Sequence, residues 1–147
     1  VYFKNFKPER WPTGRPETGY LDCDGSPTKT EILDAYQTEN HHLWELSFGK
    51  RTAEEFYDLK SDPYCMENVA ADPRFEEQKN LWSNLLTQNL IEQEDPRILG
   101  KGDVFDNYPI MPKQIRFYER FFKGEKLDHV WVNETDFRPE QNEEFSK

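Results

Sequence analysis

The stretch DPRFEEQKNLWSNLLTQNLIEQE, residues 72–94, is the longest regular element that the sequence predicts. Asp72 suits an N-cap, and Pro73 suits the first turn of a helix. Asp95-Pro96 ends the pattern. The helix has an apolar face at helical spacing. We expect this face to cover a sheet, and its marker residues are Phe75, Trp82 and Leu85.

Two shorter stretches supply candidate strands for that sheet. Residues 1–6 and 55–59 both supply large apolar side chains to the two faces of a strand, and Phe56 and Tyr57 would point to opposite faces. Two strands alone make a marginal sheet. We therefore predict an α+β architecture, with a small antiparallel sheet packed by one long helix and with long loops. We also expect further strands of the sheet to lie outside this sequence.

The segments around this core carry their own local signals. Residues 7–24 are rich in Pro and Gly and predict a long irregular loop. Ser26-Pro27 predicts a helix that runs to about Thr38. Residues 41–48 fit a helix ended by Gly49, but they fit a strand as well, because their apolar residues also alternate.

The C-terminal region is predicted with less regular structure. A further helix is expected to begin at Pro112 and to end near Gly124. An extended piece is expected over residues 127–132, and residues 137–147 are expected to form a polar tail. We expect two regions in the chain, residues 1–110 and a C-terminal extension over residues 111–147.

The formal net charge of −10 limits the classes of molecule that this chain is expected to bind. Nucleic acids and anionic membrane surfaces attract clustered Lys and Arg, so neither is expected to bind this chain. No apolar run approaches the roughly 20 residues of a membrane span. Residues 1–30 nevertheless carry one more basic than acidic side chain. An anionic ligand is therefore expected near these first thirty residues.

The sequence lacks the common catalytic and metal-binding patterns. It contains no Walker loop, no H-E-x-x-H and no G-x-S-x-G motif. Cys23 and Cys65 have no zinc spacing, and they could pair, stay free or be buried. Adjacent His41 and His42 point apart on a helix or a strand and cannot clip a metal together. We predict no metal site and no catalytic residue. Asn133 begins an N-glycosylation acceptor pattern whose use depends on the source.

The segment KRTAEEFYDLKSDPY, residues 50–64, resembles the C-terminal signature of the type I sulfatases, R-P-x-E-E-L-Y-D-L-x-x-D-P. The likeness continues through ENVAADPRF, residues 67–75, which is similar to the family's E-x-x-N-L-A-x-D-P. The long helix and then residues 94–96 follow in the family's order. Upstream, residues 9–12 and 26–28 resemble bacterial sulfatases of the heparan N-sulfatase (sulfamidase) type. The resemblance covers roughly residues 1–110.

The resemblance implies a hydrolase of sulfate esters or N-sulfates, acting on a sulfated glycan, whose large catalytic domain precedes Val1. That N-terminal domain would be the partner of this segment, in the same or another chain. It would hold the family's two catalytic groups, a formylglycine made from Cys in C-x-P-S-R or C-x-A-x-R and a calcium ion. Neither Cys23 nor Cys65 fits that motif. No cofactor is therefore expected in this segment itself. A secreted, periplasmic or lysosomal location would follow from the family.

This segment would then complete the fold and wall one side of the substrate cleft. The side chains predicted to contact a sulfated saccharide are Arg10, Trp11, Lys29 and His42. A sugar ring could stack on Trp11 while Arg10 pairs with the sulfate. Two alternatives stay open. The chain could be a stand-alone, non-catalytic binding or interaction module, or it could be the small subunit of a two-chain sulfatase.

Overall fold

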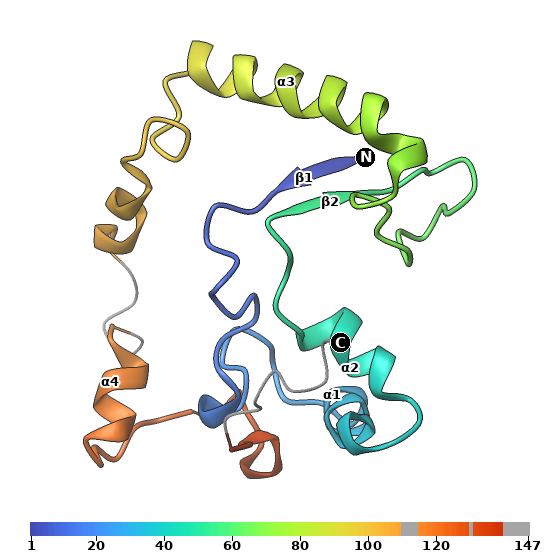
Figure 1. Ribbon diagram of the computed structural model, residues 1–147. Coiled ribbons are helices and arrows are strands. Elements are labelled where there is room, and N and C mark those ends of the chain that lie inside the picture. The colour runs from blue at the N-terminus through green and yellow to red at the C-terminus, as the bar shows by residue number, and fades with distance from the viewer. Residues whose placement is uncertain (110–114, 130, 140–147) are drawn as a thin grey trace. The chain divides into compact units, whose positions relative to one another are not determined.

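The computed structural model describes residues 1–109, 115–129 and 131–139 (Figure 1). The chain forms two compact units. Unit 1 contains Val1–Pro8 and Arg51–Pro109, and unit 2 contains Glu9–Lys50 and Ile110–Lys147. One boundary coincides with the predicted division near residue 110. Residues 9–50, however, belong with the C-terminal segment rather than with the rest of the predicted first region.

The sheet of unit 1 consists of two antiparallel strands in the described part of the chain. Strand β1 is Tyr2–Lys4 and strand β2 is Glu54–Phe56, with Phe3 opposite Glu55. The predicted α+β class and its small antiparallel sheet are thus confirmed, although both strands are shorter than predicted. A backbone hydrogen bond from Asn5 N to the Ala53 carbonyl, at 2.9 Å, extends the pairing beyond β1.

The two outer edges of this sheet differ. The outer edge of β2 is covered, because Val69 N donates to the Phe56 carbonyl at 2.9 Å and Phe56 N donates to Asn68 Oδ1 at 3.0 Å. In an antiparallel pair successive peptide groups alternate in direction, so those of Tyr2 and Lys4 point away from β2. No strand adds to this β1 edge among the residues that the structure describes.

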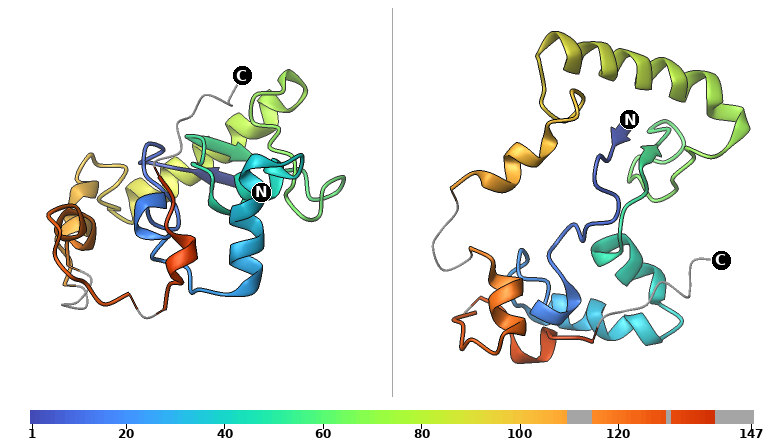
Figure 2. Two further views of the ribbon diagram at one scale, coloured as in Figure 1. Left: turned by 90° about the horizontal axis from the view of Figure 1, so that it is seen from below. Right: turned by 60° about the vertical axis from the view of Figure 1, so that its left-hand side comes forward.

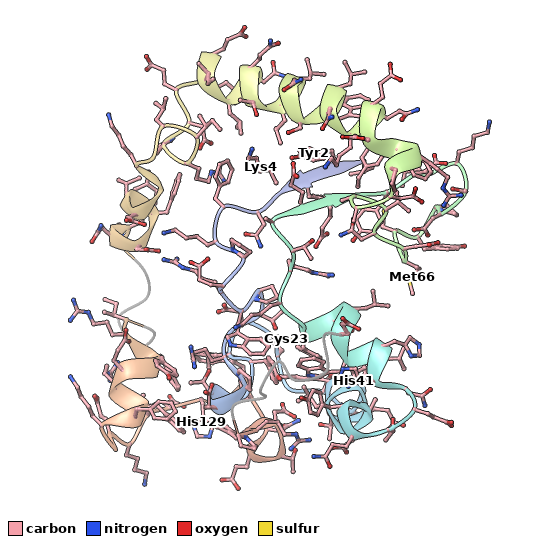
Figure 3. All side chains as sticks on the ribbon, in the orientation of Figure 1. Tyr2, Lys4, Cys23, His41, Met66 and His129 are labelled. Atoms are coloured by element: carbon pink, nitrogen blue, oxygen red, sulfur yellow. The ribbon has the colours of Figure 1, made fainter. Side chains whose placement is uncertain are left out.

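Helix α3, Glu76–Glu92, lies along one face of the two strands (Figures 1 and 2). A 3-10 turn at Pro73–Phe75 precedes it, and the Asp72 carboxylate caps that turn by accepting from Arg74 N at 2.9 Å. The predicted cap and first turn are therefore confirmed, and α3 ends two residues before the predicted end at residue 94. Figure 3 labels Tyr2 and Lys4 on the side of β1 that faces α3.

The predicted sheet-covering face of α3 is wrong for two of its three marker residues. Phe75 does pack toward the sheet, with its ring centroid 6.2 Å from that of Phe56. Trp82 and Leu85 remain 50% and 44% exposed. The helix instead turns polar side chains to β1 and β2. Lys79 Nζ lies 3.6 Å from Glu54 Oε2, and Ser83 Oγ accepts a hydrogen bond from Tyr2 Oη at 3.1 Å.

Helices α1, α2 and α4 belong to unit 2. Helix α1 is Pro27–Asp34, capped by Ser26, whose Oγ accepts from Lys29 N at 3.1 Å. A 3-10 turn at Ala35–Gln37 continues it. Helix α2 is His41–Phe48, which decides between the two structures predicted for these residues. Helix α4 is Phe117–Phe122, and the predicted start at Pro112 lies outside the described residues.

The remaining short elements are 3-10 helices. Two belong to unit 2, at Pro16–Thr18 within the predicted loop and at Glu134–Asp136. One belongs to unit 1, at Gly102–Asn107. The predicted extended piece at residues 127–132 forms no strand in its described residues, and residues 140–147 of the predicted polar tail lie outside the described part. Phe137 is not part of a polar tail, because its ring stacks on Phe121 at 5.7 Å.

The core of unit 2 is aromatic. Tyr20, Leu33, Trp44 and Phe48 are buried together, and Tyr20 and Phe48 bring their ring centroids to 4.8 Å. Large rings bury much apolar area each, so a few of them build a core in a chain with only 35% hydrophobic residues.

A buried ion pair lies beside this core. Lys29 and Asp136 are 3% and 0% exposed, with Lys29 Nζ 3.4 Å from Asp136 Oδ2. The ammonium also donates to the carbonyls of Gly19 at 2.7 Å, Cys23 at 2.6 Å and Tyr20 at 3.3 Å. Because a buried charge is costly unless it is paired and hydrogen-bonded, these contacts are what allow Lys29 to lie in the interior.

The C-terminal segment is attached to the N-terminal half of unit 2 by several other contacts. Trp131 Nε1 donates to the Leu21 carbonyl at 2.9 Å, and Arg138 N donates to the Pro16 carbonyl at 2.9 Å. Arg138 also forms an ion pair with Asp34 at 2.6 Å. Residues 131–138 are therefore a part of the folded unit and not an appendage.

We predict that the Lys29–Asp136 pair is strongly coupled. Lys29→Met and Asp136→Asn should each reduce the free energy of unfolding by about 3–5 kcal/mol, because each leaves one charge buried without its partner. The double variant should lose less than the sum of the two. Urea unfolding followed by tryptophan fluorescence measures all three.

The exposed pair of Asp72 and Arg74 provides a matched control. Arg74→Ala should change the free energy of unfolding by no more than about 1 kcal/mol. Additive losses in the double variant, or a loss near 1 kcal/mol for Asp136→Asn, would contradict the coupling.

Candidate functional site

Trp11 forms an aromatic platform on unit 2. Its side chain is half-buried and meets the rings of Tyr20 and Trp44 edge-on, each at 6.3 Å between centroids. Lys50 Nζ lies 5.1 Å from the Trp11 ring centroid, within the range of a cation–π contact. Arg10, the preceding residue, is exposed. We call Arg10, Trp11 and Lys50 the Trp11 platform.

Gly49 determines where Lys50 lies. Helix α2 ends there, and Gly49 N donates to the Glu45 carbonyl at 3.1 Å. A Cβ on Gly49 would approach that same carbonyl oxygen to 2.6 Å, so a larger residue would force the chain away. The close turn at Gly49 thus directs Lys50 back to the ring of Trp11.

Tyr20 packs against Trp11 from the buried core of unit 2. Its backbone is left-handed, with φ of 51°, and its side chain is fully buried. The hydroxyl accepts a hydrogen bond from Trp44 Nε1 at 3.1 Å. Burial raises the pKa of Tyr20 to about 12, because the phenolate would lose its hydration. The phenol therefore stays neutral, and its ring packs edge-on against Trp11.

The other two predicted contact residues lie elsewhere. Lys29 is in the interior, where three carbonyls and Asp136 surround its ammonium. His42 is exposed on α2. Its neighbour His41 packs its ring 5.3 Å from Trp44, and His41 Nδ1 lies 2.6 Å from the Tyr36 carbonyl. Arg10 and Trp11 are thus neighbours by sequence alone, and the structure places Lys29 within the fold.

Sequence reasoning missed Lys50 and Tyr20. A lysine directly after a helix-ending glycine was the only local signal for Lys50. Tyr20 follows Gly19 in a loop, and nothing in its spacing indicates a buried ring. Both residues act through contacts with segments far away in the chain, which periodicity does not report.

The platform has the chemistry of a surface for anionic, ring-shaped ligands. An indole face accepts the apolar face of a sugar ring, and neighbouring cationic side chains attract sulfate or carboxylate groups. Over the described residues, no three or more His, Cys, Asp or Glu side chains gather into a group that could hold a metal ion. In the same part of the chain, no helix has the length and apolarity to cross a membrane.

Comparisons with known proteins returned no match to a protein-family model, to a curated protein or to a solved structure.

We predict a loss of stability at high pH that depends on Tyr20. Its pKa is about 10 in an unfolded chain and about 12 in the fold. The stabilisation is complete below about pH 10 and is lost as the pH rises toward about 12, because only the unfolded chain then loses its proton. The loss should reach about 2–3 kcal/mol.

Urea unfolding of the protein and of Tyr20→Phe, at pH 9 and pH 11, tests this prediction. The phenylalanine variant should show a smaller decline over this range, since Tyr57, whose pKa is also raised to about 12, contributes equally to both proteins. Equal declines would show that Tyr20 does not control the alkaline limit.

Proposed function

We propose that this chain is the C-terminal segment of a sulfatase, a hydrolase of sulfate esters or N-sulfates on a glycan. In this proposal the segment completes the fold of the parent enzyme, and the Trp11 platform forms part of the wall of its substrate cleft. The formylglycine and the calcium ion belong to the preceding catalytic domain. The residues of this chain bind and orient the sulfated sugar and take no part in breaking the sulfate bond.

One observation carries the substrate part of this proposal. Trp11 is half-exposed, the Lys50 ammonium lies 5.1 Å from its ring, and the preceding residue in the sequence is the exposed Arg10, on a chain whose net charge is −10. A cation at an indole, next to an arginine in the sequence and in an otherwise acidic chain, suits a ligand that has both a ring and negative groups. The docking part is supported by the β1 edge, to which none of the described residues adds a strand, and by the exposed apolar residues of unit 1.

The two alternative functions predict different partners for this chain. A stand-alone binding module would use the same platform without any hydrolase. A small subunit of a two-chain sulfatase would use it beside a separately encoded catalytic chain. The intact mass of the protein isolated from its source distinguishes a long parent polypeptide from the other two, and a co-purified chain with the C-x-P-S-R or C-x-A-x-R motif identifies the two-chain enzyme.

We predict that the chain binds a sulfated disaccharide through the Trp11 platform. The dissociation constant should be on the order of 1 mM, as fits a small exposed site. Trp11→Ala should weaken binding about tenfold, because it removes the stacking surface, and Trp11→Phe should retain most of it. Isothermal titration with a heparin-type disaccharide, and with its desulfated form, measures these affinities.

Arg74→Ala, which removes an exposed arginine from unit 1, is the control for a general loss of positive charge. Circular dichroism checks that Trp11→Ala remains folded. Equal binding of the desulfated sugar, or unchanged affinity in Trp11→Ala, would remove the platform from the proposal.

A separate prediction concerns activity. This chain alone should not hydrolyse an aryl sulfate, since it lacks the formylglycine motif. In the parent enzyme, Trp11→Ala should lower kcat/KM for a sulfated oligosaccharide about tenfold and leave a small aryl sulfate unaffected, because only the longer substrate reaches the platform. Aryl sulfatase activity from the isolated chain would contradict our assignment.

A further inference from the structure

Helix α3 carries an apolar face that unit 1 does not cover. All of its residues belong to the described part of the chain, and none of them is buried. Leu81, Trp82 and Leu85 are 65%, 50% and 44% exposed. Their spacing of one and four residues places them on a common face, opposite the one that carries Lys79 and Ser83 to the sheet. We call these three residues the α3 patch.

Acidic residues border the α3 patch at both ends. Glu77 precedes Leu81 by four residues and Glu92 follows Leu85 by seven, so both lie on the face of the patch. The two glutamates are about 22 Å apart along the helix axis. Both are exposed, and within the described residues neither belongs to an ion pair.

This charge pattern decides against a second copy of the chain as the occupant. Two α3 helices packed antiparallel would place Glu77 of each against Glu92 of the other. A parallel pair would place identical glutamates together. In both arrangements like charges would meet at both ends of a small apolar contact, which is unfavourable.

An anionic lipid surface is disfavoured for the same reason. Residues 76–94 contain Lys79 as their only basic side chain, and Lys79 is already paired with Glu54 on the sheet side. The α3 patch thus offers an apolar centre with a negative group at each end. The complementary occupant has an apolar centre and a positive group at each end.

We propose that the α3 patch docks a protein helix whose apolar stripe is bordered by Lys or Arg about 20 Å apart. The leucines and Trp82 supply the apolar contact, and Glu77 and Glu92 set the alignment of the partner helix. This proposal stands on unit 1 alone and does not depend on the sulfatase assignment or on the Trp11 platform.

The test uses the full chain and designed peptides. The probe is a helical peptide of roughly 20 residues with leucines at positions i, i+3, i+4 and i+7 and lysine pairs at both ends. A matched peptide carries glutamates in place of the lysines. Fluorescence anisotropy should give a dissociation constant on the order of 10 µM for the lysine peptide, and binding at least about tenfold weaker for the glutamate peptide.

Variants of α3 locate the contact. Leu85→Ser should weaken binding of the lysine peptide about tenfold, as loss of a central apolar contact does. Ile91→Ser is the matched control, because Ile91 is 52% exposed on the same helix but lies off the patch. It should leave the affinity unchanged. Glu77→Lys together with Glu92→Lys should reverse the preference between the two peptides.

Three results would overturn the proposal. The lysine peptide could fail to bind, or bind no better than the glutamate peptide. The protein could sediment as a dimer that Leu85→Ser dissociates, which would make a second copy the occupant. Finally, vesicles of zwitterionic lipid could bind the protein in a way that Leu85→Ser abolishes, which would make the patch a lipid contact. Circular dichroism confirms that each variant keeps its helix content.

Discussion

The ammonium of Lys29 and the carboxylate of Asp136 meet in the interior of unit 2, and the rest of that unit is arranged around them. Lys29 Nζ donates hydrogen bonds to the carbonyls of Gly19, Tyr20 and Cys23. These bonds constrain the loop from which the Tyr20 ring projects. The Tyr20 hydroxyl in turn accepts a hydrogen bond from Trp44 Nε1, and the Tyr20 ring packs edge-on against Trp11. A charge that is buried only because its partners are in place thereby positions the surface that we assign to ligand binding.

Unit 1 is stabilised differently. It has two strands, one helix, and few buried apolar side chains, with Phe56 and Tyr57 as its buried residues of this kind in the described part. Small sheets of this size are marginal alone. We propose that another protein surface contacts the exposed apolar residues of α3 and the β1 edge, which no described strand pairs with. Unit 1 therefore supplies the surface that we propose for docking, whereas unit 2 carries its own core and the Trp11 platform.

The Trp11 platform of unit 2 and the α3 patch of unit 1 carry charged side chains of opposite sign. The Trp11 platform has Lys50 at an indole that follows Arg10 in the sequence, and the α3 patch places Glu77 and Glu92 beside leucines and a tryptophan. In both proposed contacts, aromatic and apolar groups would supply the contact area and the charges would select the partner. The net charge of −10 describes neither surface, because each depends on which side chains the fold brings together.

The sequence by itself determined the elements that have signals within a few residues. Ser26-Pro27, Asp72-Pro73 and Gly49 begin or end helices through their own hydrogen bonds and backbone preferences, so the α+β class and the long helix could be predicted. Arg10 and Trp11 are consecutive, so their proximity follows from the sequence alone. Tertiary structure decided which face of α3 meets the sheet, that Lys29 is buried by Asp136, and that Lys50 joins Trp11. These outcomes depend on segments that lie far apart in the chain and meet only in the fold, and local periodicity carries no record of such partners.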